Sequence, residues 1–294
     1  MDKSFFCPEE IAQNYIEIGR KKAEMPALKQ FILGILAGAF IAFASQGANA
    51  AIHTISSVGL AKALAGALFS AGLMMVIVAG AELFTGNCLI VISYNEHRSS
   101  LADLLKNWFF VYTGNFVGAM IVVFLILKSG QLGFSNGLLG GFTIKMAVYK
   151  TELTFGNAFF MGILCNWLVC TAVWMAAGAR DMAGKILAIF FPIWLFITSG
   201  FEHSVANMYY IPAGILAKAD PEFVQAAVSL GVDPEKIAAL DWGSFVISNL
   251  IPVTLGNIVG GAIFVGAVYW FVYLYKKKAS TEKITALSKE ACQK

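Results

Sequence analysis

Two short stretches, Ala81-Glu-Leu-Phe-Thr-Gly-Asn87 and Gly200-Phe-Glu-His-Ser-Val-Ala-Asn207, interrupt apolar runs of this sequence. In both, a Glu is followed five residues later by an Asn. The first lies inside the otherwise uncharged run 63–95, and the second lies inside 186–217. Backbone that is not helical is tolerated at membrane depth only where it is buried in protein or lines a watery cavity. We therefore expect two broken membrane helices beside a solute path.

The composition of the whole chain agrees with a membrane protein. Of its 294 residues, 58% are hydrophobic and 13% charged, and the mean hydropathy is +0.72. Soluble domains carry roughly a quarter charged residues, so a water-soluble globule is excluded. The net charge of +3 is small and the lysines are dispersed, which excludes the concentrated basic face that nucleic-acid binding requires. We expect an all-α integral protein of the lipid bilayer.

Four further apolar stretches are long enough to span a membrane without interruption. Crossing the hydrocarbon takes roughly 20 residues of helix. The four stretches are 31–52, 107–127, 153–179 and 242–275. With the two broken helices, the sequence predicts six transmembrane helices.

The distribution of basic residues predicts the orientation. The segments 1–29, 96–106, 180–185 and 276–294 hold most of the 21 Lys and Arg residues, and they lie on one side of a six-span protein. Cytoplasmic segments carry such an excess. We therefore expect a multi-pass protein of the cell membrane with both termini in the cytoplasm.

Three regions are expected along the chain. Residues 1–29 form a cytoplasmic N-terminal region, in which 9–22 has the pattern of an amphipathic helix after Pro8. This helix is either a lid over a pore entrance or an interfacial anchor. Residues 30–275 form the six-helix channel domain, and 276–294 form a basic cytoplasmic tail.

Two outer segments have different patterns. Segment 128–152 is apolar and rich in Gly, and we expect a loop that folds partly back into the protein. The sequences Asp220-Pro221-Glu222 and Asp233-Pro234-Glu235 each combine a capping Asp with a first-turn Pro and Glu. This combination predicts two short surface helices.

A repeat relates the two halves of the chain. The third span contains Asn107, Gly114-Asn115 and Val117-Gly118, and the sixth contains Asn249, Gly256-Asn257 and Val259-Gly260 with identical spacing. Three spans therefore occur twice. Because three is odd, the second copy enters from the opposite face, which predicts an inverted 3+3 repeat.

These motifs resemble the formate/nitrite transporter family. The resemblance rests on the two break sequences, on Lys106-Asn107-Trp108 and on Asn249-Leu-Ile-Pro-Val-Thr-Leu-Gly-Asn257, and it covers about residues 10 to 275. It implies an aquaporin-like fold and a homopentamer with one pore per protomer. It also implies passage of small monovalent anions or their conjugate acids, with formate, nitrite and hydrosulfide as substrates of known members.

The resemblance further implies a set of pathway residues. The substrate pathway would contain Thr85, His203, Lys150, Asn166 and Val169, and the constrictions would be formed by Phe69, Leu73, Leu83, Phe84 and Phe196. Taken without the resemblance, the constriction residues are ordinary core or lipid-facing side chains. Asn166 is equally consistent with hydrogen bonding between helices.

The chemistry of an anion in a membrane explains why these residue types are needed. Moving a bare anion into a low dielectric has an idealised cost of about 20 kcal/mol. Lys150 would raise the local anion concentration at the outer mouth. The Thr85 hydroxyl and backbone N–H groups at the breaks would then donate hydrogen bonds to the anion, while a proton delivered through His203 would neutralise it. The alternative for His203 is a buried histidine bonded to Glu202 or Asn207.

The remaining polar residues at the breaks are expected to be structural. Glu82, Asn87, Glu202 and Asn207 have repeat-related positions, and we expect the two carboxylates to accept backbone N–H bonds that hold the breaks in shape. Asn115 and Asn257 are expected to bond between helices, beside Gly114/Gly118 and Gly256/Gly260.

The sequence also bears on three other classes of protein. An enzyme is disfavoured because the three His residues lie far apart and no metal-binding, nucleotide-binding or hydrolase motif occurs, so neither metal nor cofactor is expected. A neutral-solute channel of the aquaporin type would show paired Asn-Pro-Ala sequences. A proton-coupled carrier stays open. Formate is the favoured substrate because the fifth- and sixth-span motifs look most like those of formate channels, with nitrite and hydrosulfide as alternatives.

Overall fold

Helices make up nearly the whole fold of this chain. The computed structural model describes residues 5–275, so the predicted tail 276–294 lies outside the described residues. The helices are α1 Pro8–Glu24, α2 Ala27–Ile52, α3 Val58–Ala79, α4 Phe84–Asn87, η1 Cys88–Ile90, α5 Val91–Asn95, α6 Leu101–Lys128, η2 Gln131–Gly133, α7 Leu138–Thr151, α8 Phe155–Gly178, α9 Met182–Ser199, α10 Ser204–Ala217, α11 Pro221–Ser229, α12 Pro234–Ala239, η3 Ser244–Leu250, α13 Ile251–Ile258, η4 Val259–Ala267, α14 Val268–Trp270 and η5 Phe271–Tyr275.

Six of these helical segments are long and apolar enough to cross a membrane. They are α2, α3, α6, α8, α9 and the continuous helix Ser244–Tyr275 that contains α13 and α14. The predicted number of spans is therefore confirmed. The predicted breaks are also present, because α3 ends at Ala79 and α9 ends at Ser199, and a new helix begins only after a short irregular segment in each case.

A glycine makes each break possible. Gly80 and Gly200 follow the last helical residue with φ of 84° and 75°. This left-handed conformation is easily adopted only by a residue without a Cβ atom. The chain then runs extended for a few residues before α4 or α10 begins, which places polar backbone in the centre of the molecule.

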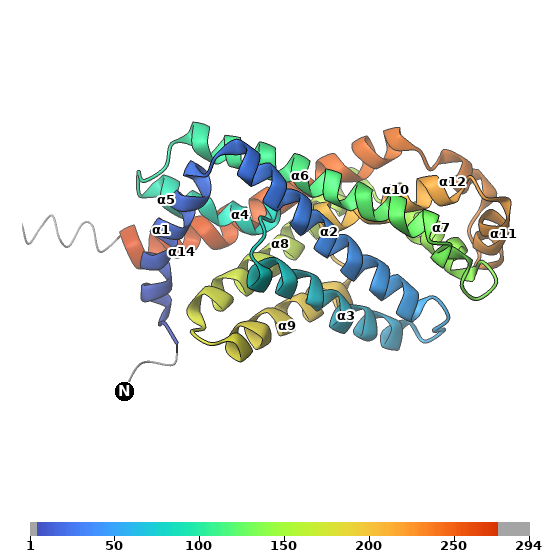
Figure 1. The fold of residues 1–294 in the computed structure, drawn as a ribbon, viewed down its shortest axis with the longest axis horizontal. Coiled ribbons are helices and arrows are strands. Elements are labelled where there is room, and N and C mark those ends of the chain that lie inside the picture. The colour runs from blue at the N-terminus through green and yellow to red at the C-terminus, as the bar shows by residue number, and fades with distance from the viewer. Residues whose placement is uncertain (1–4, 276–294) are drawn as a thin grey trace, which may run out of the picture.

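The molecule has two distinct ends (Figure 1). Helices α1, α5 and α14 gather at one end, called here the α1 end, and α7, α11 and α12 gather at the other, called here the α7 end. The two interrupted spans, α3 and α9, lie side by side between them. Substrate passing between the ends would therefore move along α3 and α9 and past both breaks.

Glycines bring the other helices close together in pairs. A Cβ added at Gly118 would lie 2.0 Å from the Ile35 carbonyl oxygen, and a Cβ added at Gly260 would lie 2.2 Å from the Ile163 carbonyl oxygen. No side chain fits at such distances. The predicted small-residue contacts therefore join α2 to α6 and α8 to the sixth span.

We expect Gly118→Ala to destabilise the protein by about 1–3 kcal/mol, because the methyl group forces α2 and α6 apart. Gly47→Ala is the matched control, since an added Cβ at Gly47 meets nothing within 4 Å. The measurement is the melting temperature of the detergent-solubilised protein. Equal melting temperatures for the two variants would contradict close packing at Gly118.

Segment 128–152 differs from the predicted loop. It contains α7, which packs against α10 and α11. Gly137 precedes the helix with φ of 76°, and Gly140 and Gly141 leave room for the Phe223 ring and the backbone of α11. The glycines that suggested a loop are thus used for a sharp entry turn and for close packing.

The other predicted helices outside the spans are confirmed. Asp220 and Asp233 cap α11 and α12 by accepting the backbone N–H of Glu222 and Glu235. Helix α1 buries Ile11 and Tyr15, and the Tyr15 ring stacks on Trp174 of α8 at 5.6 Å. The apolar face of α1 therefore packs against the body of the protein. Whether it also acts as a lid stays a prediction.

Candidate transport pathway

The first break is held by the Asn115 side chain of α6. Its Oδ1 accepts the backbone N–H of Phe84 at 3.0 Å. Its Nδ2 donates to the carbonyl oxygens of Gly34 at 2.8 Å and Glu82 at 2.9 Å. One amide therefore satisfies backbone groups on both sides of the break and joins them to α2, which removes the cost of leaving them unpaired.

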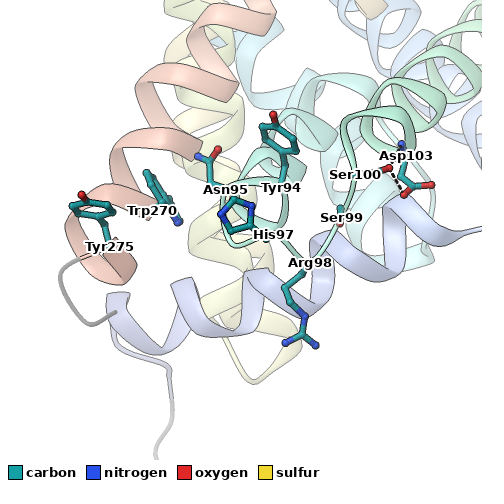
Figure 2. Close-up of a pocket in the computed structure, with 9 residues that line it drawn as sticks. All are labelled: Tyr94, Asn95, His97, Arg98, Ser99, Ser100, Asp103, Trp270 and Tyr275. Atoms are coloured by element: carbon teal, nitrogen blue, oxygen red, sulfur yellow. Dashed lines mark hydrogen bonds between the residues drawn. The ribbon is translucent and has the colours of Figure 1, made fainter. Parts of the chain in front are cut away.

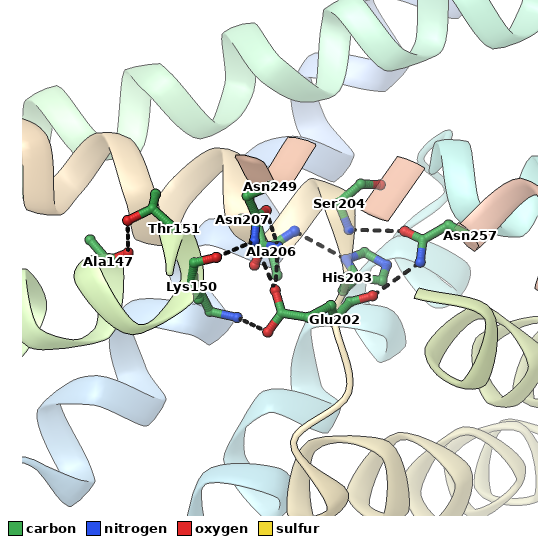
Figure 3. A network of polar contacts seen from close by, with 10 residues as sticks. All are labelled: Ala147, Lys150, Thr151, Glu202, His203, Ser204, Ala206, Asn207, Asn249 and Asn257. Atoms are coloured by element: carbon green, nitrogen blue, oxygen red, sulfur yellow. Dashed lines mark hydrogen bonds and ion pairs between the residues drawn. The ribbon is translucent and has the colours of Figure 1, made fainter. Parts of the chain in front are cut away.

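The second break has the same arrangement around Asn257 (Figure 3). Its Oδ1 accepts the backbone N–H of Ser204 at 2.9 Å, and its Nδ2 donates to the carbonyl oxygens of Gly162 at 2.8 Å and Glu202 at 3.0 Å. The predicted interhelical role of both asparagines is confirmed. The sequence repeat is therefore also a repeat of hydrogen bonds.

The carboxylates at the breaks have a different role from the predicted one. Glu82 accepts from the Lys22 ammonium and from Asn87 Nδ2, both at 2.7 Å. Glu202 accepts from Lys150 and from Asn207 Nδ2, again both at 2.7 Å. The expectation that these carboxylates bind backbone N–H groups was wrong, because Asn115 and Asn257 already do so.

Each carboxylate cluster is completed by one further asparagine. Asn107 accepts from Asn87 at 2.9 Å and donates to the Lys22 carbonyl at 3.0 Å. In the second half, Asn249 accepts from Asn207 at 2.6 Å and donates to the Lys150 carbonyl at 2.9 Å (Figure 3). Every polar residue of one cluster thus has its counterpart in the other.

Lys150 is buried instead of standing free at an outer mouth. Its side chain is 9% exposed and that of Glu202 is 2% exposed, with the ion pair at 2.7 Å. The ammonium also lies 5.3 Å from the centre of the Tyr210 ring. Its charge is therefore neutralised inside the protein, and the predicted role as an exposed collector of anions does not fit this position.

Thr85 and His203 meet at the centre, one from each break. Thr85 Oγ1 lies 2.9 Å from His203 Nε2, and both residues are buried. The other ring nitrogen, Nδ1, accepts the backbone N–H of Ala206 at 3.0 Å and so caps α10. The alternative of a bond to Glu202 or Asn207 is not what the structure has.

These two contacts define the hydrogen-bond roles. Because Nδ1 accepts, it carries no proton, and in the neutral ring the proton is on Nε2. His203 then donates to the Thr85 oxygen. The Thr85 hydroxyl proton is left to point elsewhere, so that it can donate to a solute in the pathway.

Apolar side chains lie on both sides of this polar pair. At the α1 end, Leu73 and Leu83 line a vestibule of 520 Å³ that Lys22 and Lys29 also line. On the other side of Leu73, the rings of Phe69 and Phe196 pack edge to face at 5.7 Å. The Phe196 ring also stacks on His203 at 6.0 Å. Four of the five predicted constriction residues therefore lie around the centre, and their role as constrictions stays a prediction.

The fifth, Phe84, points elsewhere. Its ring packs against Tyr112 at 4.8 Å and Trp108 at 5.9 Å, and it lines an apolar pocket of 420 Å³ with residues of α13. Phe84 is therefore placed in the packing between α4 and α6, and the expected constriction role does not fit. Its neighbour Leu83 faces the vestibule instead.

Asn166 and Val169 both lie in α8. Asn166 Nδ2 donates to the Thr85 carbonyl at 3.2 Å and to the Asn257 carbonyl at 2.6 Å. Both residues are at most 2% exposed. Of the two roles open for Asn166, the hydrogen bonds favour bonding between helices, because they join α8 to the first break and to α13.

A separate surface pocket lies at the α1 end (Figure 2). It has a volume of 680 Å³ and is lined by residues of the α5–α6 connection and by Trp270 and Tyr275 of the last span. Trp270 donates to Glu96 at 2.8 Å, and Arg98 is paired with Glu17 at 3.0 Å. The predicted pathway residues are not part of its lining.

Comparison with known proteins identifies the class of this membrane protein. The family model for the formate/nitrite transporter matches residues 9–271. The chain belongs to this family. It is 41% identical over 271 residues to the formate channel FocA of Escherichia coli K12, covering 91% of this chain and 94% of the relative. It is 39% identical to a probable formate transporter of Methanothermobacter thermautotrophicus, covering 93% and 99%.

Solved structures show the same fold. A pentameric formate channel with formate bound superimposes with a TM-score of 0.74 at 39% identity, covering 86% of this chain and 99% of that chain. An ion channel of the same family gives a TM-score of 0.71 at 29% identity, covering 90% and 97%. The predicted family and the all-helical channel fold are therefore confirmed.

Proposed function

We propose that this chain is a channel that passes formate across a membrane. Membership of the formate/nitrite transporter family and the names of the relatives support this function. The observation that carries it is the hydrogen bond between Thr85 and His203. It places the Thr85 hydroxyl, a hydrogen-bond donor, between the leucine pair Leu73 and Leu83 and the phenylalanine pair Phe69 and Phe196. Such a centre suits a small anion that sheds its water on both sides.

Each group of residues has a separate role in the proposed transport. Anions gather in the vestibule beside Lys29 and then enter between Leu73 and Leu83. The Thr85 hydroxyl donates to a carboxylate oxygen, and His203 polarises that hydroxyl by donating to its oxygen. A weak acid can also cross the apolar rings as the neutral molecule, which avoids the several kcal/mol needed to bury the charge. Strongly hydrated ions without a neutral form are rejected.

The geometry favours a neutral His203 that donates through Nε2 over a histidine that carries a proton. Protonating Nδ1 would break its bond to the Ala206 N–H and uncap α10. The proton that accompanies formate is then exchanged with water at the constrictions. Transport of protons by His203 itself would require the cap to open in every cycle.

We expect His203→Asn to lower formate uptake about tenfold and to leave the shape of its pH profile unchanged. Asn is a good helix cap and keeps the Ala206 bond, but its shorter side chain loses the donor to Thr85. The measurement is initial uptake between pH 5 and 8, with His203→Gln as the variant that restores the reach to Thr85. A pH dependence that disappears in His203→Asn would indicate that His203 carries the proton.

We further propose the assembly and orientation of the channel. The solved relative is a pentamer, which supports a homopentamer with one pore in each protomer. The excess of Lys and Arg at the α1 end supports cytoplasmic termini on an N-terminal region 1–29 and a channel domain 30–275. The recurrence of the spacing Asn107 to Asn115 as Asn249 to Asn257 supports an inverted orientation of the two three-span halves. Tagging each terminus in right-side-out and inside-out vesicles tests this topology.

The substrate is tested with purified protein in liposomes. Uptake of formate, nitrite and hydrosulfide is compared with uptake of glycerol as the neutral solute, each against protein-free liposomes. We expect formate to pass. Passage of nitrite or hydrosulfide alone would keep the pore and change the substrate, whereas passage of glycerol alone would overturn the anion mechanism.

A further inference from the structure

Burial of Lys150 leaves the α7 end of the pathway without the cation that the sequence predicted there. The Lys62 ammonium of α3 has no hydrogen bond or ion pair within residues 5–275, and the residue is exposed. By contrast, Lys22 and Lys150 are both paired with carboxylates. Lys62 is therefore a positive charge that can act on solute.

Lys62 lies on the same face of α3 as two residues of the candidate pathway. Phe69 and Leu73 follow it by seven and eleven residues, so all three lie on one face of the helix. At 1.5 Å per residue, Lys62 is about 16 Å from Leu73 along the helix axis. The vestibule at the α1 end begins at Leu73, so Lys62 lies at the opposite mouth, beyond the pair of Phe69 and Phe196.

The second break lies directly beside this lysine. An added Cβ at Gly200 would be 3.3 Å from Lys62 Nζ, so the ammonium reaches the left-handed turn that ends α9. One helical turn along α3, an added Cβ at Gly66 would be 3.0 Å from Thr198 Oγ1. Trp194 and Thr198 of α9 therefore pack closely against Gly66 of α3, and the Thr198 hydroxyl faces α3.

Thr198 supplies a second polar group at this place. Its hydroxyl oxygen is buried and has no hydrogen-bond partner among the described residues. A buried hydroxyl without a partner costs free energy, and a ligand or water normally satisfies it. Thr198 is two residues from Phe196 in α9, so its hydroxyl lies at about the same height along the helix as the phenylalanine constriction but on a different face.

We propose that Lys62 and Thr198 form an anion-binding subsite at the α7 end of the pathway. It takes a small monovalent carboxylate before the anion passes Phe69 and Phe196, with the ammonium as the counter-charge and the hydroxyl as a donor. This subsite rests on the proposed function, since it collects the anion that the channel passes. It takes the role that the sequence assigned to Lys150.

The expected effect on anion concentration follows from the single positive charge of Lys62 at a water-filled pore entrance. At about 7 Å in water, a single positive charge raises the local concentration of a monovalent anion about threefold. Salt screens this attraction, because the Debye length falls from about 10 Å at 0.1 M to about 3 Å at 1 M.

The test uses the full chain in vesicles of defined sidedness, with salt varied only on the α7 side. We expect Lys62→Gln to raise the KM for formate uptake about threefold and to remove the dependence on that salt. Thr198→Val should raise the KM and keep the salt dependence. The matched control is Lys128→Gln, which removes an exposed charge at the last residue of α6, also at the α7 end. This variant should behave as the wild type.

A chemical rescue separates charge from structure. Lys62→Cys labelled with an aminoethyl thiosulfonate regains a positive charge and should recover the wild-type KM, whereas a sulfonatoethyl label should raise it further. Equal KM and salt dependence in Lys62→Gln, Lys128→Gln and the wild type would overturn the subsite while formate transport stands. Loss of transport without rescue by the positive label would also overturn it. Absence of formate transport in the wild type would instead reject the proposed function.

Discussion

Replacing Lys150 with Met is expected to destabilise the folded protein by about 3–5 kcal/mol, because it leaves the Glu202 carboxylate buried without its partner. The Glu202 side chain is 2% exposed, so water cannot replace the ammonium. The remaining donors, Asn207 and Asn249, are amides and carry no charge. The melting temperature of the detergent-solubilised protein should fall by on the order of 10 °C.

The first half of the chain provides the matched control. Lys22 pairs with Glu82 at the same distance of 2.7 Å, but the Lys22 side chain is 27% exposed against 9% for Lys150. Lys22→Met should therefore have the smaller effect. The double variant Lys150→Met/Glu202→Gln removes both charges and should recover much of the loss. A Lys150→Met protein as stable as Lys22→Met would show that Glu202 is not desolvated in the way the structure indicates.

The two breaks were predictable because polar residues at membrane depth are rare. The spacing of Asn107 to Asn115 recurs as Asn249 to Asn257, and the structure gives both pairs equivalent hydrogen bonds. Periodicity and hydropathy were enough to find these residues. The bonds themselves depend on which backbone groups the break leaves free, so the partners of the carboxylates were predicted wrongly.

The equivalence of Lys22 and Lys150 was missed, although the sequence contained a signal. Both lysines precede the glycines that bond to the break asparagines, Gly34 and Gly162, by twelve residues. Lys22 lies in an amphipathic helix, whose charges are normally solvated. Only the tertiary structure shows that α1 folds back far enough for Lys22 to reach Glu82.

The direction of side chains at an irregular segment is not encoded in a periodic pattern. Leu83 and Phe84 are consecutive residues of the first break, and either could face the path. The bond from Asn115 to the Phe84 N–H fixes the backbone, and the Phe84 ring then packs against Tyr112 and Trp108. A rule of helical or strand spacing cannot decide between such neighbours.

Replacing Thr85 with Val is expected to lower formate transport by about 10- to 100-fold. Valine keeps the shape of threonine but removes the hydroxyl that donates to the anion, and a hydrogen bond to a charged group contributes about 1.5–3 kcal/mol. The change also leaves the His203 Nε2–H without its acceptor at the centre of the path. The measurement is initial uptake of formate into liposomes with equal amounts of folded protein.

Thr85→Ser is the control that isolates the hydroxyl. Serine keeps the donor to the solute and the acceptor for His203, so its transport should stay within a few-fold of the wild type. A stable Thr85→Val protein with wild-type transport would show that the anion does not bind at this hydroxyl. Because Thr85 comes from the first break and His203 from the second, loss of transport in Thr85→Val but not in Thr85→Ser would support one substrate position built jointly by both halves of the chain.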